Sequence, residues 1–169
     1  LLAICGSLRK GSVNRKLMLE AIRLFGKADV TDADLRLPLY DGDREEAEGI
    51  PAPVQALADA IKAVDGILIA CPVYNRGVTG VLKNALDWVS RVKGGPWRDR
   101  PVALVSAADG PAGGARAQFA LRLNMVPFRA RVLAGDPGLA DEVETFRRDV
   151  IARKGQGAKV LADVADMRG

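Results

Sequence analysis

The chain has 169 residues, of which 49% are apolar and 27% charged, and 25 basic against 21 acidic residues leave a net charge of +4. This balance is typical of a soluble globular protein. From the length we expect a single domain over residues 1–169. The basic residues are dispersed and do not cluster with aromatic residues, and no apolar run approaches the ~20 residues of a membrane span, so we expect neither nucleic-acid nor membrane binding.

Short, continuous apolar runs alternate with amphipathic stretches along the chain. Such runs indicate strands buried on both faces, and they cover residues 1–5, 66–71 and 102–106. Weaker strand patterns lie within residues 29–35 and 131–134. Apolar residues at helical spacing predict the intervening helices, and their stripes are Leu17, Ala21, Leu24 and Phe25; Val54, Leu57, Ala58, Ile61 and Val64; Val81, Leu82, Ala85, Leu86 and Val89; Ala117, Ala120 and Leu121; Leu139, Val143, Phe146 and Val150; and Leu161, Ala162 and Ala165.

This alternation of strand and helix predicts an α/β fold with a doubly wound parallel sheet and right-handed crossovers. Pro53 is well placed for the first turn of the second helix. We expect residues 37–53, rich in Asp, Glu, Gly and Pro, to form a long loop of the kind that often carries function.

The chain contains no histidine and two cysteines. A Ser-His-Asp or Cys-His nucleophile and a histidine metal site are therefore excluded, and we expect a cofactor to carry any chemistry. Cys5 and Cys71 end two strands that should be neighbours, so we expect both to be buried and inert. A redox role is the alternative, which the absence of a Cys-x-x-Cys pair disfavours. The absence of a disulfide framework favours a cytoplasmic location. Because Leu1 lies inside a predicted strand, we also expect the full protein to begin earlier.

The first apolar strand opens onto a loop suited to a phosphate. Ser7, Ser12 and Asn14 supply hydrogen-bond donors, and Arg9 can balance a phosphate dianion. The helix that follows adds unpaired N–H groups and the positive end of its dipole. The alternative is that Ser12 and Asn14 only cap this helix while Arg9 is solvated. No Gly-x-Gly-x-x-Gly fingerprint or Walker lysine motif is present, which disfavours dinucleotide-fold and P-loop sites.

Two further loops leave neighbouring strands at the same edge of the predicted sheet, where ligands bind in open parallel sheets. The second loop offers Pro72, Tyr74 and Asn75, which suit a flat heterocycle, although a plain strand-to-helix turn is the alternative. The third loop, residues 106–114, is rich in glycine, which allows close backbone approach to a ligand or makes a flexible turn. Together the loops predict a mononucleotide site.

The helix expected over residues 80–91 carries a second stripe beside its apolar one. This stripe contains Asn84, Asp87, Trp88 and Arg91, and Asp87 and Arg91 are spaced to form a pair. An exposed tryptophan among polar groups indicates a subunit contact, and the alternative is that Trp88 belongs to the core.

The segments 6–14, 72–75 and 80–91 together closely resemble the NADPH-dependent FMN reductase family, which includes quinone, azo-dye and chromate reductases. The resemblance covers about residues 1–123. It implies a flavodoxin-like, five-stranded, three-layer α/β/α fold. It also implies an FMN site, in which Ser7, Arg9, Ser12 and Asn14 hold the phosphate and the ring lies against Pro72, Val73, Tyr74 and Asn75, with Ser106, Asp109, Gly110 and Gly113 nearby. One departure is Val73, where the family usually has Glu.

The function we expect is hydride transfer from NADPH or NADH to bound FMN and then to a small-molecule electron acceptor such as a quinone. The chain is expected to form a homodimer or homotetramer through helix 80–91. Two alternatives are a non-enzymatic flavodoxin-like electron carrier and a reductase that supplies free reduced FMN to another enzyme. Four arginines could meet the 2′-phosphate of NADPH, and the sequence singles out none of Arg44, Arg76, Arg98 and Arg116.

Overall fold

A five-stranded parallel sheet forms the centre of the protein, as predicted. The computed structural model describes residues 1–109, 112, 114–133 and 139–166, with side chains described as far as residue 153. The strands are β1 (Leu2–Cys5), β2 (Thr31–Asp32), β3 (Ile67–Ala70), β4 (Pro101–Val105) and β5 (Arg131–Val132). They lie in the order β2-β1-β3-β4-β5, which is the flavodoxin-like order with its switch point between β1 and β3.

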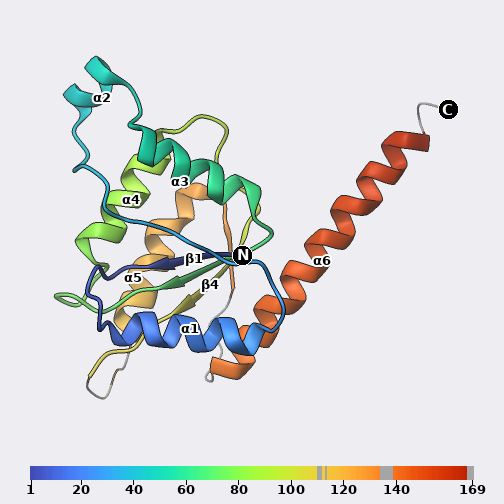
Figure 1. Ribbon diagram of the computed structural model, residues 1–169, viewed down its shortest axis with the longest axis horizontal. Coiled ribbons are helices and arrows are strands. Elements are labelled where there is room, and N and C mark those ends of the chain that lie inside the picture. The colour runs from blue at the N-terminus through green and yellow to red at the C-terminus, as the bar shows by residue number, and fades with distance from the viewer. Residues whose placement is uncertain (110–111, 113, 134–138, 167–169) are drawn as a thin grey trace.

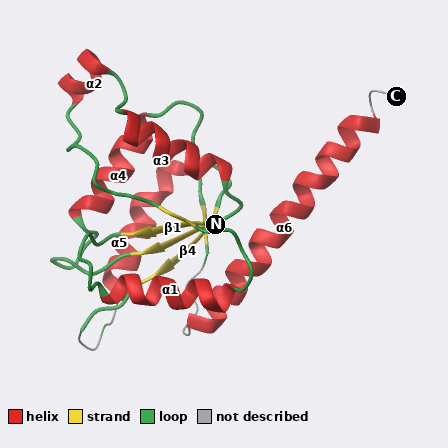
Figure 2. Ribbon diagram, viewed as in Figure 1, coloured by secondary structure: helices red, strands yellow, loops and turns green. Residues whose placement is uncertain are grey.

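Helices cover both faces of the sheet, which confirms the three-layer α/β/α arrangement (Figures 1 and 2). The helices are α1 (Val13–Phe25), α2 (Gly42–Glu48), α3 (Ala52–Ala63), α4 (Gly80–Arg91), α5 (Ala115–Met125), the 3₁₀ turn η1 (Val126–Phe128) and α6 (Leu139–Asp166). Helices α3, α4 and α5 contribute to the core on one face, and α1 and α6 to the core on the other.

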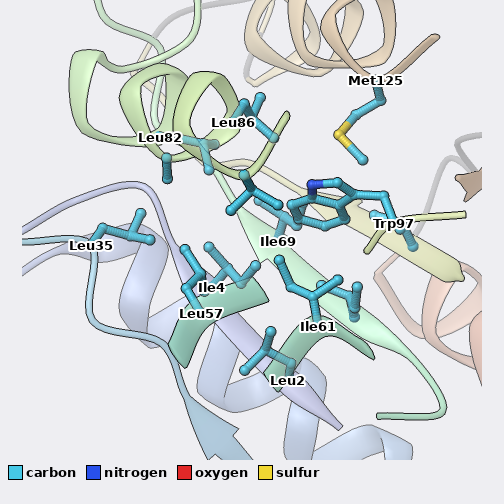
Figure 3. Packing of buried hydrophobic residues seen from close by; sticks show 14 of the residues in the cluster. Leu2, Ile4, Leu35, Leu57, Ile61, Ile69, Leu82, Leu86, Trp97 and Met125 are labelled. Carbon is cyan, nitrogen blue, oxygen red and sulfur yellow. The ribbon is translucent and has the colours of Figure 1, made fainter. Parts of the chain in front are cut away.

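The central strands are buried on both faces, as their continuous apolar runs predict. Every residue of β1, β3 and β4 is buried. In Figure 3, Ile4 of β1 and Ile69 of β3 lie close to Leu57 of α3 and to Leu82 and Leu86 of α4. Burying one such side chain fully contributes about 1.5–3 kcal/mol, so these contacts stabilise the packing of the helices on the sheet.

The edge strands are much shorter than the sequence patterns. β2 pairs with β1 through two residues of the expected 29–35 segment, and both are exposed. β5 pairs with β4 through Arg131 and Val132, while Ala134, the last residue of that predicted strand, lies outside the described residues. An edge strand has one neighbour and little burial, which is why its apolar pattern is weak.

Residues 37–53 were expected to be a loop, and this expectation is wrong in part because the segment contains α2. Asp41 begins this helix by accepting hydrogen bonds from the N–H groups of Asp43 at 3.0 Å and Arg44 at 3.4 Å, and Gly49 with φ of 76° ends it. Helix α3 then follows, with Pro53 in its first turn as predicted.

The last two apolar stripes were expected to form separate helices, and the structure corrects this. Both lie within α6, which runs without a break over Leu139–Asp166 and extends beyond the body of the protein (Figure 1). No proline interrupts the sequence between the stripes. In the part of the chain that the structure describes, no helix has the length and apolarity that crossing a membrane requires.

Candidate functional site

Three loops meet at the carboxyl edge of the sheet and enclose one cavity. They follow β1, β3 and β4, which are adjacent in the sheet. The cavity has a volume of about 870 Å³. Its described lining residues are Ser7, Arg9, Ser12, Val13, Asn14, Pro72, Val73, Tyr74, Ala107, Ala108, Asp109, Ala112 and Arg116. It lies beside the β1/β3 switch point, where doubly wound folds bind their ligands.

The first loop leaves β1 at Gly6 and turns tightly into α1. A Cβ at Gly6 would lie 3.1 Å from Thr79 Oγ1 and 3.4 Å from the Ala70 carbonyl oxygen, so the chain passes close to β3 here. The Ser12 N–H donates to the Arg9 carbonyl at 3.1 Å. Ser12 caps α1 by accepting from the Arg15 N–H at 3.3 Å, as the capping alternative predicts.

Asn14 ties the first loop to the third. Its Nδ2 donates to the Ala107 carbonyl at 2.8 Å, and its Oδ1 accepts from the Ala107 N–H at 2.9 Å. Asn14 is only 4% exposed, and both bonds are part-buried. Asn14 therefore fixes the distance between two walls of the cavity.

The second loop carries a small hairpin above the cavity. Tyr74 and Gly77 exchange backbone hydrogen bonds of 3.0 and 3.3 Å, with Asn75 and Arg76 between them at positive φ of 49° and 66°. Left-handed backbone at two non-glycine residues is costly, so the fold imposes this turn. Tyr74 is 53% exposed and stands at the rim, where a ring system could lie beside it.

The third loop brings α5 against the end of β4. A Cβ at Gly114 would lie 2.1 Å from Ser106 Cβ, which shows how closely the start of α5 packs on this strand end. Ser106 Oγ donates to the Cys71 carbonyl at 2.5 Å and so joins the third loop to the second. Asp109 lines the cavity, while Gly110 and Gly113 lie outside the described residues.

The cavity has a buried floor and a charged rim. Ser7, Ser12 and Asn14 are buried polar residues on the floor. The exposed rim carries Arg9, Arg116 and Asp109, which give the described lining a net charge of +1 (two cations minus one anion). The site thus offers donors and positive charge to an anionic ligand, and backbone and apolar walls at Pro72 and Val73 to a flat ring.

Cys5 ends β1 and Cys71 directly follows β3, and both are buried, as expected. They belong to the cores on opposite faces of the sheet. Burial raises the pKa of the Cys71 thiol above its ordinary value, so this thiol stays protonated at neutral pH. A protonated, buried thiol is a poor nucleophile, which supports the expectation that Cys71 is inert.

Most of the predicted site residues lie together in the cavity. Asn75 and Ser106 do not line it: Asn75 is exposed in the hairpin and Ser106 bonds to Cys71. Sequence reasoning missed the lining residues Val13, Ala107, Ala108 and Ala112, because small apolar residues carry no distinctive signal. It noted Arg116 without placing it here.

Helix α4 has the predicted bounds, but the prediction for its second stripe was wrong about Trp88 and about the Asp87–Arg91 pair. Trp88 is 0% exposed and therefore belongs to the core, the alternative that the sequence left open. Asp87 pairs with Lys83 at 2.6 Å and Arg91 with Glu45 at 2.8 Å, in place of the expected Asp87–Arg91 pair. Trp88 is buried and Arg91 pairs with Glu45 because residues 38–45, here called the strap, fold over α4.

The strap is held by several contacts. Trp88 Nε1 donates to the Pro38 carbonyl at 2.8 Å, and Asn84 Nδ2 donates to the same oxygen at 2.9 Å. The ring of Tyr40 meets the Trp88 ring edge-on at 5.0 Å. The Tyr40 hydroxyl donates to Glu45 at 3.0 Å, and this bond raises the pKa of Tyr40 above its ordinary value.

Comparison with known proteins agrees with this geometry. The family model for NADPH-dependent FMN reductase matches residues 1–143. The chain belongs to the NADPH-dependent FMN reductase family. Its members are oxidoreductases, and the protein is accordingly an enzyme that depends on FMN and a nicotinamide cofactor.

Named relatives extend the comparison. The chain is 39% identical over 137 residues to a quinone reductase of Escherichia coli, covering 77% of this chain and 71% of the relative. It is 42% identical over 127 residues to an NAD(P)H-dependent FMN reductase of Pseudomonas aeruginosa, covering 74% and 68%. Among solved structures, the flavoenzyme NAD(P)H:(acceptor) oxidoreductase FerB of Paracoccus denitrificans superposes with a TM-score of 0.80 at 27% identity, covering 90% of this chain and 97% of that one.

Proposed function

We propose that this protein, as a single domain over residues 1–169, binds FMN in the cavity between the three loops. The phosphate lies on the first loop, held by Ser7, Arg9, Ser12 and the start of α1. Asn14 contributes through its remaining amide hydrogen and by fixing the third loop. The observation that carries the proposal is the cavity itself, which joins a polar, positively charged end to apolar and backbone walls at the switch point.

Residues 72–75 would hold the isoalloxazine ring in this proposal, with Ser106, Asp109, Gly110 and Gly113 nearby. FMN held there would supply the two-electron chemistry, namely hydride uptake from NAD(P)H and transfer of the electrons to an acceptor. The chain orients the ring and provides the N–H groups at the start of α5, whose dipole favours negative charge nearby. Val73 places an apolar side chain where a carboxylate is usual, so this wall binds through shape and backbone.

A quinone is the proposed acceptor class. The support is the relatives' names, a quinone reductase in Escherichia coli and an NAD(P)H:quinone oxidoreductase in potato, the latter 41% identical over 125 residues. We also propose a cytoplasmic location, which the two unpaired, buried thiols support.

The phosphate position is tested by Arg9→Ala, with Lys10→Ala as the matched control. Lys10 is adjacent in sequence but is not among the described residues that line the cavity. One hydrogen bond to a charged group contributes roughly 1.5–3 kcal/mol, so Arg9→Ala should weaken FMN binding about 10- to 100-fold. Riboflavin, which has no phosphate, should bind both variants almost as it binds the wild type. Fluorescence titration measures all of these affinities, and equal losses of FMN and riboflavin affinity would show that Arg9 shapes the loop instead.

The proposed turnover with a quinone acceptor is tested by steady-state oxidation of NAD(P)H at varied quinone concentration. A single cavity that donor and acceptor occupy in turn predicts parallel lines in double-reciprocal plots. Absorbance of the bound flavin should fall within seconds when NAD(P)H is added without quinone. A flavin that stays oxidised for minutes would support an electron carrier, and a flavin lost on gel filtration would support a supplier of free reduced FMN.

We further propose that the protein forms a homodimer or homotetramer over α4, with the strap as the contact surface. Leu39 is 82% exposed on the strap, and Tyr40 beside it covers Trp88. A second apolar surface on α5 and η1, formed by Phe119, Leu123 and Val126 at 72%, 74% and 71% exposure, provides the further face that a tetramer needs.

Leu39→Glu should weaken this association, because an unpaired charge would be buried at the contact. Leu19→Glu is the control, since Leu19 is 56% exposed on α1 at the opposite face. Sedimentation at micromolar concentration measures the assembly. A monomeric wild type, or equal effects of the two substitutions, would contradict the proposal.

A further inference from the structure

The cavity presents two guanidinium groups from different loops. Arg9 comes from the first loop, beside Ser7 and Ser12 on the buried floor. Arg116 comes from the first turn of α5, beside Ala112 and Asp109 on the exposed rim. Among the described residues, neither group takes part in an ion pair. The phosphate of FMN accounts for Arg9, which leaves Arg116 free to meet a second anionic group.

Arg9 and Arg116 are both exposed at the rim, but Arg9 belongs to the first loop with Ser7 and Ser12, where the phosphate of FMN is proposed, whereas Arg116 belongs to α5. Arg116 is therefore the cation that a co-substrate entering from solvent can meet. If FMN occupies the cavity, a nicotinamide dinucleotide would enter from solvent with its nicotinamide directed toward the flavin. Its adenosine end then stays near the cavity mouth. NADPH and NADH differ there by one phosphate, on the adenosine 2′ oxygen. A guanidinium binds such a phosphate by paired, charge-assisted hydrogen bonds.

The structure separates Arg116 from the other three arginines that the sequence left open. Arg44 pairs with Glu48 at 2.9 Å on α2. Arg98 lines a different cavity together with Trp97 and Phe128. Arg76 lies in the hairpin and is not among the described residues that line the flavin cavity. Arg116 is the member of this set that lies at the site.

The packing of the start of α5 positions the backbone of Arg116 beside the cavity. Gly114, two residues earlier, packs so closely on Ser106 that a Cβ there would lie 2.6 Å from the Ser106 carbonyl oxygen. No acidic residue lies in the first turn, and no side chain caps it. The N–H groups at its start and the helix dipole therefore add positive potential beside the guanidinium.

We propose that Arg116 binds the 2′-phosphate of NADPH and makes this enzyme prefer NADPH to NADH. The proposal rests on the proposed flavin site, because it assumes that FMN occupies the floor of the cavity. Arg116 acts on specificity: it binds the remote end of the donor and takes no part in hydride transfer. Binding energy from such a remote group lowers the barrier only for the donor that carries the phosphate.

The test compares Arg116→Gln with Arg98→Gln, which removes the same charge at the separate cavity. In the FMN-loaded wild type, kcat/KM should be higher for NADPH than for NADH. Arg116→Gln should lower kcat/KM for NADPH about ten-fold more than for NADH, the loss expected for one exposed charge-assisted contact. Arg98→Gln should leave the ratio unchanged.

A second measurement does not depend on turnover. Calorimetry with FMN-loaded protein should show that adenosine 2′,5′-bisphosphate binds about ten-fold more weakly to Arg116→Gln than to wild type, with adenosine 5′-monophosphate affected much less. Equal losses for both nucleotides, or no loss for either, would overturn the proposal. So would a loss of FMN affinity in Arg116→Gln, since Arg116 would then bind the FMN phosphate. A wild type that binds no FMN would refute the proposed function itself.

Discussion

Replacement of Asn14 by alanine is the sharpest test of how the cavity is built. The substitution removes both hydrogen bonds to Ala107, of 2.8 and 2.9 Å, from a side chain that is 4% exposed. It leaves the Ala107 N–H and carbonyl without their partners in a part-buried position. A typical hydrogen bond contributes about 0.5–1.5 kcal/mol, and an unsatisfied buried group costs about 1–3 kcal/mol. We therefore expect Asn14→Ala to lower the free energy of unfolding by about 2–4 kcal/mol.

Urea denaturation of the FMN-free protein measures this loss, with Asn124→Ala as the control. Asn124 makes one side-chain bond, of 2.7 Å to the Ala120 carbonyl within α5, and should lose about 1 kcal/mol or less. The urea dependence of the free energy should not change, because the folded state stays compact. FMN affinity should fall as well, since the first and third loops are no longer tied. Equal losses for the two variants would refute the role of Asn14 as a link between loops.

Three further predictions follow from single contacts. Gly114→Ala should lower the free energy of unfolding by about 1–3 kcal/mol in urea denaturation, because its Cβ would overlap Ser106, whereas Gly80→Ala, in open space, should not destabilise the protein. Trp88→Phe should cost at least about 1 kcal/mol in the same assay, because it loses the bond to Pro38 and the smaller ring leaves space in the core. In a Tyr74→Phe background, absorbance titration should place the Tyr40 pKa above its ordinary value. Glu45→Gln should lower this pKa. The Tyr40–Glu45 bond is present below the Tyr40 pKa and is lost as the pH rises through it.

Much of the site could be predicted from sequence because it follows directly from strands that are buried on both faces. A continuous apolar run such as residues 67–70 is stable as a strand only where helices cover both faces of the sheet. The loop that follows it must then lie at the edge of the sheet where the strands end. Ser7, Arg9, Ser12 and Tyr74 could be placed together in this way, because parallel strands end at the same edge. Local chemistry also determined the bounds of α4 and the Pro53 turn.

The tertiary structure decided what depends on contacts between distant segments. Trp88 is buried by the strap, which lies some fifty residues earlier in the sequence. The residue pattern of α4 therefore does not predict this burial. The same holds for the partners of Asp87 and Arg91, for Asn14 as a link to Ala107, and for Ser106 bonding to Cys71. From sequence, Arg116 was one of four candidate arginines for the 2′-phosphate of NADPH. The packing of Gly114 on Ser106 places its helix at the cavity. Sequence periodicity reports which face of an element is buried, whereas the partner across that face is chosen by the fold as a whole.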